Sequence, residues 1–399
     1  MKTQIKVSKA KPILGYSRIC LILGGIWPLP LQSQNRVLQR AYSIYSGLMR
    51  FYLPFMLISL LIKFAISIVN ERTERNLEKI FFKLNYIIIL LITCFSMMLC
   101  QRKEVKEIIG YIMEDDNEII CSKVEDMIQC HLAQVRLCSR SCLAIMILTF
   151  GSGISMCFEN YWRRLEIDRN NIRYNESVEK PFVFELYYFN LDANKHDTAL
   201  VVVNDVCTAI NSLLCTSTKM LLFSSIIHSA SILKRLQIKF EKLYGYRGRV
   251  LIVLRDLVQE HQNVIGFVEK LNNWLKYLIF WEFLLDSINI AAVSMQLITS
   301  EGKLLISPIL FFCVLCSQTF ILGWCTNEVK YQSLMLADAL LRGKWYHQSE
   351  EVKNILLVML VQTQRPLVLT IGPFDAMTIQ SALTIMKGSY SYISIMMND

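Results

Sequence analysis

The run Leu84–Gln101, LNYIIILLITCFSMMLCQ, contains no Asp, Glu, Lys or Arg and decides the class of fold. Two further runs share this property, Ser141–Phe158 and Leu304–Asn327. A helix needs roughly 17–25 mostly apolar residues to cross the hydrocarbon core of a bilayer. Each run therefore predicts a membrane-spanning helix.

The composition of the whole chain agrees with this prediction. Of its 399 residues, 53% are hydrophobic and 19% are charged, against about 45–50% and about 25% in soluble proteins. Four more apolar stretches are interrupted by only one or two charges each. We therefore expect an all-α membrane protein in a single unit, residues 1–399, with seven transmembrane helices at 41–69, 80–100, 138–158, 198–228, 275–299, 304–327 and 374–397.

The distribution of positive charge predicts the orientation of these helices. Residues 1–40 contain seven Lys or Arg and no acid, and short segments rich in Lys and Arg stay cytoplasmic. With that end inside, the predicted inner segments carry 25 Lys and Arg and the outer loops carry 10. We expect a cytoplasmic N-terminus and an extracellular C-terminus. The single N-x-S/T sequon, at Asn175, then lies in an outer loop, either as a glycosylation site or as a chance match.

Two predicted inner segments, 229–275 and 328–365, continue the helical pattern past the membrane. Leu236, Phe240 and Leu243 recur at three- and four-residue spacing, as do Leu254 and Leu257, and charged residues fill the other positions. Such stripes indicate either helices that bundle in the cytoplasm around a second core or helices that lie flat on anionic lipid. The first alternative would make these segments a cytoplasmic anchor.

The sequence lacks the residue patterns of enzymes and of metal sites. The five His are scattered, and there is no H-E-x-x-H, no G-x-S-x-G and no phosphate-binding glycine loop. Cys313-x-x-Cys316 lies in an apolar run without a second pair, which disfavours zinc binding. We predict no enzyme activity, no cofactor and no metal. The net charge of +9 falls on inner segments that face anionic lipid, so we predict no nucleic-acid partner.

Several polar residues inside the predicted spans need a structural role. Glu282 and Asp286 lie four residues apart on one helix face. They form either a buried proton or cation site, or a pair that is hydrated or bridged to Arg or Lys. Lys219 is too far from Asp205 along one helix to reach it, so each needs a partner on a neighbouring helix. Near the outer ends of two spans, Cys157 and Cys207 either pair or pack as small apolar side chains.

The last 60 residues contain a distinctive series of motifs. They are Ala339-Leu340-Leu341, Trp345-Tyr346, Gln364–Phe374 (QRPLVLTIGPF) and Thr384–Tyr392 (TIMKGSYSY). Upstream, Glu260-His261-Gln262 leads into Phe267–Asn272, and Lys11-Pro12 and Gly25-x-Trp27-Pro28 lie near the N-terminus. Together these motifs resemble the insect odorant receptor family, with the C-terminal part the most specific.

The resemblance implies a ligand-gated, non-selective cation channel in the cell membrane. Members of that family assemble as a heterotetramer with a shared co-receptor subunit, through an anchor domain formed by inner helical extensions. The chain is shorter than the co-receptor and lacks its long second inner loop, so it resembles a tuning subunit. The implied partners are the co-receptor, a small volatile ligand and membrane lipid.

The final helix would line the pore in this family. Arg365-Pro366 breaks the preceding helix, because Pro cannot continue the backbone hydrogen bonds. The helix that follows carries one face of small, polar and apolar residues, with the hydrophobic gate near Ile395 by resemblance. The alternative is that its aromatic and apolar residues only pack. The pore and gate residues implied are Gly388, Ser391, Tyr392, Ile395 and Asn398.

Odorants in this family bind in the outer half of the helical bundle, in a pocket lined by aromatic residues. Apolar burial and shape would hold a small volatile molecule there. The candidate residues, each of which is alternatively a core residue, are Phe82, Tyr86, Phe150, Gly153, Cys157, Val206, Ile210 and Phe312.

Two other functions compete with this interpretation. A gustatory-receptor-like channel of the same superfamily would end in a T-Y-apolar-Q-Phe motif, which the segment from Ser389 to Ile395 does not match. A seven-helix G-protein-coupled receptor would have an extracellular N-terminus and D-R-Y-like or N-P-x-x-Y-like motifs, which are absent from the sequence.

Overall fold

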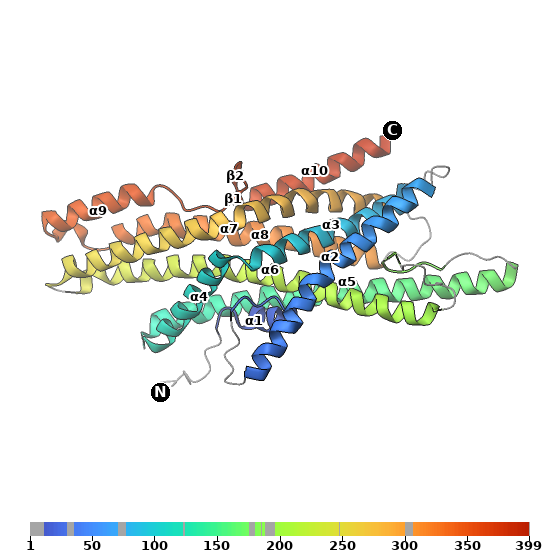
Figure 1. Ribbon diagram of the computed structural model, residues 1–399. Helices are drawn as coiled ribbons and strands as arrows, with labels where there is room; N and C mark the ends of the chain where they lie inside the picture. The colour runs from blue at the N-terminus through green and yellow to red at the C-terminus, as the bar shows by residue number, and fades with distance from the viewer. Residues whose placement is uncertain are drawn as a thin grey trace, which may run out of the picture.

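The computed structural model describes residues 12–29, 36–70, 77–122, 124–174, 180–184, 186–187, 196–246, 248–299 and 306–398. Most of them form long helices that run side by side in an elongated bundle (Figure 1). The helices are α1 (Gly15–Leu23), α2 (Arg36–Asn70), α3 (Leu77–Cys100), α4 (Lys103–Cys121), α5 (Glu125–Tyr174), α6 (Asp197–Lys242), α7 (Val250–Thr299), α8 (Ile306–Leu341), α9 (Glu350–Thr363) and α10 (Ile379–Asn398). Short 3₁₀ turns at Leu243–Gly245 and Trp345–His347 follow α6 and α8.

Among the described residues, six helices are long and apolar enough to cross a membrane: α2, α3, α5, α6, α7 and α8. Helices α5 and α7 have 50 residues each, a length of ~75 Å at 1.5 Å per residue. Since a hydrocarbon core is ~30 Å thick, more than half of each helix extends beyond it. The anchor segments are thus continuous with the spans, and α7 contains both the predicted span 275–299 and the end of the anchor segment 229–275.

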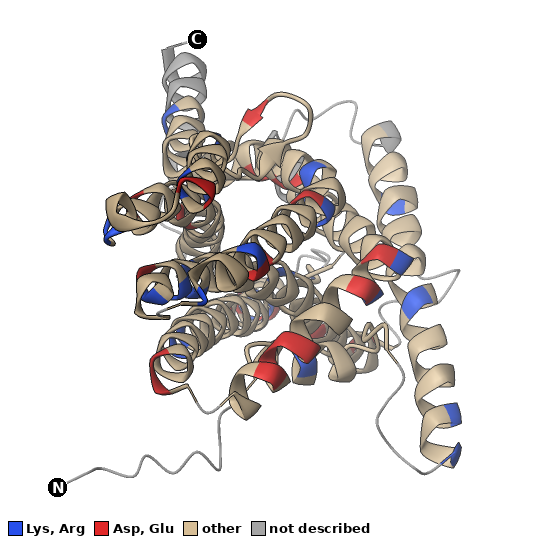
Figure 2. Cartoon of the chain, turned by 90° about the vertical axis from the view of Figure 1, so that its left-hand side faces the viewer, with Lys and Arg blue, Asp and Glu red and all other residues tan. Residues whose placement is uncertain are grey.

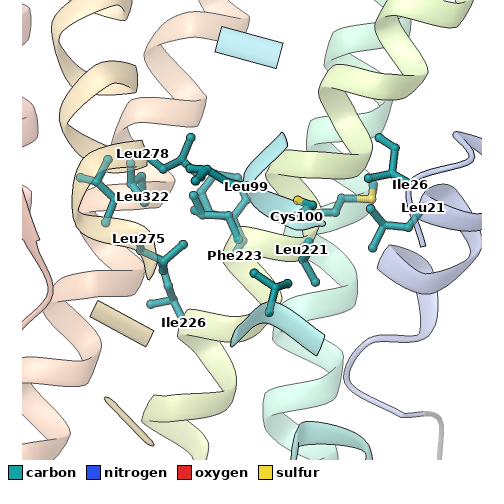
Figure 3. Packing of buried hydrophobic residues seen from close by; sticks show 14 of the residues in the cluster. Leu21, Ile26, Leu99, Cys100, Leu221, Phe223, Ile226, Leu275, Leu278 and Leu322 are labelled. Carbon is teal, nitrogen blue, oxygen red and sulfur yellow. The ribbon is translucent and has the colours of Figure 1, made fainter. Parts of the chain in front are cut away.

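Helix α6 is the centre of the bundle. All residues from Thr216 to Leu233 are buried, and α6 packs against α1, α3, α5, α7 and α8. Small residues allow this close approach; for example, the Ser17 hydroxyl of α1 lies 2.6 Å from the Ser224 hydroxyl of α6. Figure 3 shows apolar side chains of α6 and of the segments around it that pack together at this level: Leu21, Ile26, Leu99, Cys100, Leu221, Phe223, Ile226, Leu275, Leu278 and Leu322.

A second core lies at the anchor end of the bundle. There α6, α7, α8 and α9 enclose Leu236, Phe240, Leu254, Leu336 and Leu356. The leucine and phenylalanine stripes of the sequence therefore bury a second core, as expected for helices that bundle. Figure 2 shows this end of the molecule, where acidic and basic residues lie on the outer faces of the helices.

The segment between α9 and α10 differs from the sequence-based expectation. The predicted break is present, since α9 ends at Thr363, just before Arg365-Pro366. However, the next helix begins at Ile379 and not at residue 374, because Thr370–Ile371 (β1) and Asp375–Ala376 (β2) form an antiparallel hairpin. Gly372 makes the turn with φ of 57°, and its N–H donates to the Lys276 carbonyl of α7 at 2.8 Å. Contacts with α7 stabilise this hairpin, and local sequence does not encode them.

Candidate functional site: a cavity inside the helix bundle

A cavity of about 100 Å³ lies between α3, α5, α6, α7 and α8, beside Phe184. Its walls are largely apolar, and polar side chains occupy a few positions. The lining residues are Tyr86, Ile89, Leu90, Ile92, Thr93, Thr149, Ser152, Gly153, Met156, Phe184, Thr208, Asn211, Ser212, Cys215, Lys219, Asp286, Phe311, Val314, Leu315 and Gln318.

Two aromatic side chains form one wall of this cavity. The ring of Tyr86 meets that of Phe184 edge to face, with centroids 5.1 Å apart, and the Tyr86 hydroxyl donates to Met156 Sδ at 3.5 Å. Asn204 on α6 fixes the position of Phe184: it accepts from the Phe184 N–H and donates to its carbonyl, both at 2.8 Å. Phe184 is therefore held against α6 at the cavity wall.

A second, smaller cavity of about 70 Å³ lies beside the first and shares Tyr86, Met156 and Phe311 with it. It is bordered by Glu159 and Arg163 of α5, which form an ion pair at 2.5 Å. Residues 181–183 also line this second cavity.

A buried ion cluster borders the first cavity through Lys219 and Asp286. Lys219 Nζ of α6 lies 3.0 Å from Glu282 Oε1 and 4.0 Å from Asp286 Oδ2 of α7. All three side chains are buried. Lys219 thus has the partner that the sequence required on a neighbouring helix, and the acidic pair is bridged to a lysine, one of the alternatives left open above. Pairing is what makes burial of these charges tolerable.

One polar side chain of the cavity is not paired. The amide oxygen and nitrogen of Asn211 are both buried and lack a hydrogen-bond partner within the part of the chain that the structure describes. An amide offers two donors and an acceptor. A bound molecule with a hydroxyl or carbonyl group would satisfy it.

The predicted ligand-binding residues divide into two groups. Tyr86 and Gly153 line the cavity. The cavity wall does not include Phe150 and Cys157 of α5, Val206 and Ile210 of α6, or Phe312 of α8, although other residues of these helices line it. Val206 faces outward with 52% of its surface exposed, and Cys157 and Cys207 are free thiols. The side chain of Phe82 and the sequon at Asn175 lie outside the described residues.

The predicted pore residues all lie on α10, which packs against α7 and α8. It comes close to α8 at Gly323, where an added Cβ would lie 2.9 Å from Ala382 Cβ. Gly388 is half-buried. The structure does not describe the side chains of Ser391, Tyr392, Ile395 and Asn398. The assignment of these residues to the pore therefore stays a prediction.

Sequence reasoning missed the polar residues of the cavity, Asn211 and Gln318 among them, and it missed Phe311. The available signal was weak: polar residues inside an apolar span are costly and are often functional. That rule selects Asn211 and Gln318 but cannot say that they face the same space.

The fold defines a multi-pass helical membrane protein with an internal, largely apolar cavity. The family model described as 7tm Odorant receptor matches residues 75–390. The chain therefore belongs to the 7tm odorant receptor family, as the sequence motifs indicated, and this family consists of receptors and not enzymes.

Similar sequences and structures agree with the family. Odorant receptor 10 of Aedes albopictus is 30% identical over 142 residues, which are 35% of this chain and 38% of that protein. Odorant receptor Or2 of Anopheles gambiae is 28% identical over 150 residues, 37% and 40% of the two chains. The match thus spans well under half the length of these relatives.

A solved structure extends the likeness to the whole fold. The olfactory receptor OR5 of Machilis hrabei aligns with 96% of this chain and 97% of its own, with a TM-score of 0.78 and 16% sequence identity. The structure of OR5 in complex with eugenol gives a TM-score of 0.79. The two proteins share one fold.

Proposed function

We propose that this chain is an odorant-binding tuning subunit of a ligand-gated, non-selective cation channel that opens together with a co-receptor subunit. The observation that carries this proposal is the internal cavity, apolar for most of its wall, among α3, α5, α6 and α8. Membership of the odorant receptor family and the shared fold with OR5, a receptor solved with eugenol, support the same role.

The size and chemistry of the cavity suggest the class of ligand. An apolar cavity of about 150 Å³ in another protein holds benzene, so a cavity of about 100 Å³ with another of about 70 Å³ beside it suits a small volatile molecule. Leaving a buried amide such as that of Asn211 without partners costs about 1–3 kcal/mol. A ligand with an apolar body and one hydroxyl or carbonyl group would recover that free energy.

Substitution of Asn211 tests the ligand class. In the wild type, an alcohol should activate at lower concentration than the hydrocarbon of the same shape, by about 5-fold or more. Asn211→Leu should remove that preference. Asn289→Leu is the matched control, because Asn289 is also a buried asparagine whose amide lacks a partner within the described ranges, yet it does not line either cavity. An unchanged preference in Asn211→Leu, or an equal loss in the control, would reject the assignment.

The exposed apolar surface of α9 supports assembly with a second subunit. Leu357, Val358 and Val361 are 62%, 70% and 58% exposed, and they border a groove with Val258 and Ile265 of α7. A patch of this kind at the anchor end suits a protein partner. We assign it to the co-receptor, with α10 of each subunit lining the shared pore.

Electrophysiology tests the channel role. The chain is expressed in cells with and without an insect odorant co-receptor, and currents are recorded from excised membrane patches that lack nucleotides. We expect ligand-evoked cation current only with both subunits. A response that survives in whole cells but disappears in the patches would indicate second-messenger signalling and would overturn the channel proposal.

A further inference from the structure

A second cluster of polar side chains lies outside both cavities, where α4, α5 and α6 meet. Asp115 and Asp116 of α4 face His228 of α6, and His131 of α5 lies next to Asp116. The exposed fraction is 0% for His228, 1% for His131 and 2% for Asp116. These residues belong to no cavity described above, and the proposed odorant response does not use them.

The polar atoms of this cluster are incompletely paired. Both ring nitrogens of His228 and of His131, and Oδ1 of Asp116, are buried without a hydrogen-bond partner in the ranges that the structure describes. Oδ2 of Asp116 does have one, the Ile13 N–H at 2.9 Å. Buried polar atoms are rarely left unpaired, and here the unpaired atoms are a carboxylate oxygen and imidazole nitrogens, which are metal-ligand types.

The distances between these atoms fit shared coordination better than direct hydrogen bonds. His228 Nε2 is 3.4 Å from Asp115 Oδ2. Hydrogen bonds of this kind are normally about 2.7–3.2 Å long. Two ligand atoms that each lie about 2.0–2.1 Å from a tetrahedral ion are separated by ~3.4 Å. One ligand atom from each of Asp115, Asp116 and His228 lies within 4.8 Å of the other two.

The surroundings position these ligands. The His228 ring meets Phe267 edge to face at 5.9 Å, and Phe267 stacks on Tyr111 at 4.7 Å. Arg235 forms an ion pair with Asp115 Oδ2, but a carboxylate offers about four acceptor positions, so Asp115 can keep Arg235 and also bind an ion.

We propose that Asp115, Asp116 and His228 bind a divalent transition-metal ion, with His131 supporting the carboxylate of Asp116. Mixed imidazole and carboxylate ligands suit zinc and its chemical neighbours, whereas magnesium and calcium prefer oxygen alone. Three protein ligands leave one position of a tetrahedral ion open. The bound ion would connect α4 to α6, which are otherwise joined at this level by the Arg235–Asp115 pair.

The test uses the purified full-length chain in lipid nanodiscs. After chelation and re-equilibration with zinc, metal content is measured by mass spectrometry, and cobalt is used as a spectroscopic probe of tetrahedral N and O ligation. We expect one zinc per chain, retained in excess magnesium, and at least about tenfold weaker binding in both Asp116→Asn and His228→Gln. Glu118→Gln is the matched control, because Glu118 is an exposed acid on the same helix.

Each possible result is decisive. A wild-type chain that binds no zinc and gives no cobalt ligand-field spectrum overturns the proposal without any variant. Equal binding in Asp116→Asn, His228→Gln and the wild type also overturns it, since the ion then lies elsewhere. If one variant fails to fold, the other is compared with Glu118→Gln, and zinc-dependent thermal stabilisation restricted to the wild type and the control supports the site.

Discussion

Two buried polar clusters in the bundle use different means to hold charge away from water. Lys219 lies between Glu282 and Asp286, so its ammonium group contacts both carboxylates. Around Asp116, by contrast, two histidines and a carboxylate oxygen lack partners among the described residues. The first cluster is closed by its own charges and borders the cavity. The second is arranged like an incomplete coordination shell and borders no cavity described above.

The largest expected effect comes from removing the cation of the closed cluster. Lys219→Met leaves two buried carboxylates without a positive partner, and breaking a buried pair in this way costs about 3–5 kcal/mol. We expect a strong loss of surface expression and of the melting temperature of the purified receptor. Lys234→Met, on the exposed side of the same helix, should leave both close to the wild type.

A double variant sharpens this prediction. Lys219→Met with Glu282→Leu removes both members of the closest pair, and apolar replacement of a buried ion pair is often neutral. Partial recovery of stability would support pairing as the stabilising feature. If Lys219→Met alone melts like the wild type, then the carboxylates are neutral in the folded protein and the ion-pair description is wrong.

The stability of the protein should depend less on Arg235, the cation of the second cluster, than on Lys219. Arg235 pairs with Asp115, whose side chain is 19% exposed, so water can reach the carboxylate when the guanidinium is removed. We expect Arg235→Met to cost about 1–3 kcal/mol, less than Lys219→Met in the same melting assay. Lys239→Met is the control, since the side chains of its pair with Glu260 are 39% and 35% exposed and partly exposed pairs of this kind contribute about 0–1 kcal/mol. A loss as large as that of Lys219→Met would show that water does not reach Asp115.

The sequence predicted the helices and the acidic pair but not the partners that complete each site. The spacing of Glu282 and Asp286 places them on one face of α7, whereas Lys219 reaches them only because α6 packs against α7. The same limit applies to Asp116 and His228, which are brought together from α4 and α6. Long-range packing, and not local pattern, determines these contacts.

Pocket residues show a second limit of the sequence. Tyr86 and Gly153 were predicted and line the cavity, but on α8 the prediction chose Phe312 where Phe311 lines it. Neighbouring helical residues differ by about 100° in direction. A run that is apolar on all sides carries no periodic signal for the inward face, so a choice between adjacent aromatic residues depends on the fold.

The smallest expected effect concerns the cavity beside the closed cluster. Gly153 on α5 faces α6, and an added Cβ would lie 2.9 Å from Ser212 Oγ. Because Ser212 can rotate, Gly153→Ala should keep the receptor folded but fill part of the cavity. We expect a several-fold rise in the ligand concentration needed for half-maximal current, with the melting temperature nearly unchanged.

Gly151→Ala is the matched control for that variant. Gly151 lies two residues before Gly153 on α5. An added Cβ at Gly151 meets no described atom within 4 Å. Alanine in a helix interior is about 0.5–1 kcal/mol more favourable than glycine, so this control should be slightly stabilised with unchanged ligand sensitivity. If both variants shift sensitivity equally, the effect comes from helix stiffness and not from the cavity. A shift confined to Gly153→Ala assigns ligand binding to the level of the bundle that borders Lys219 and Asp286.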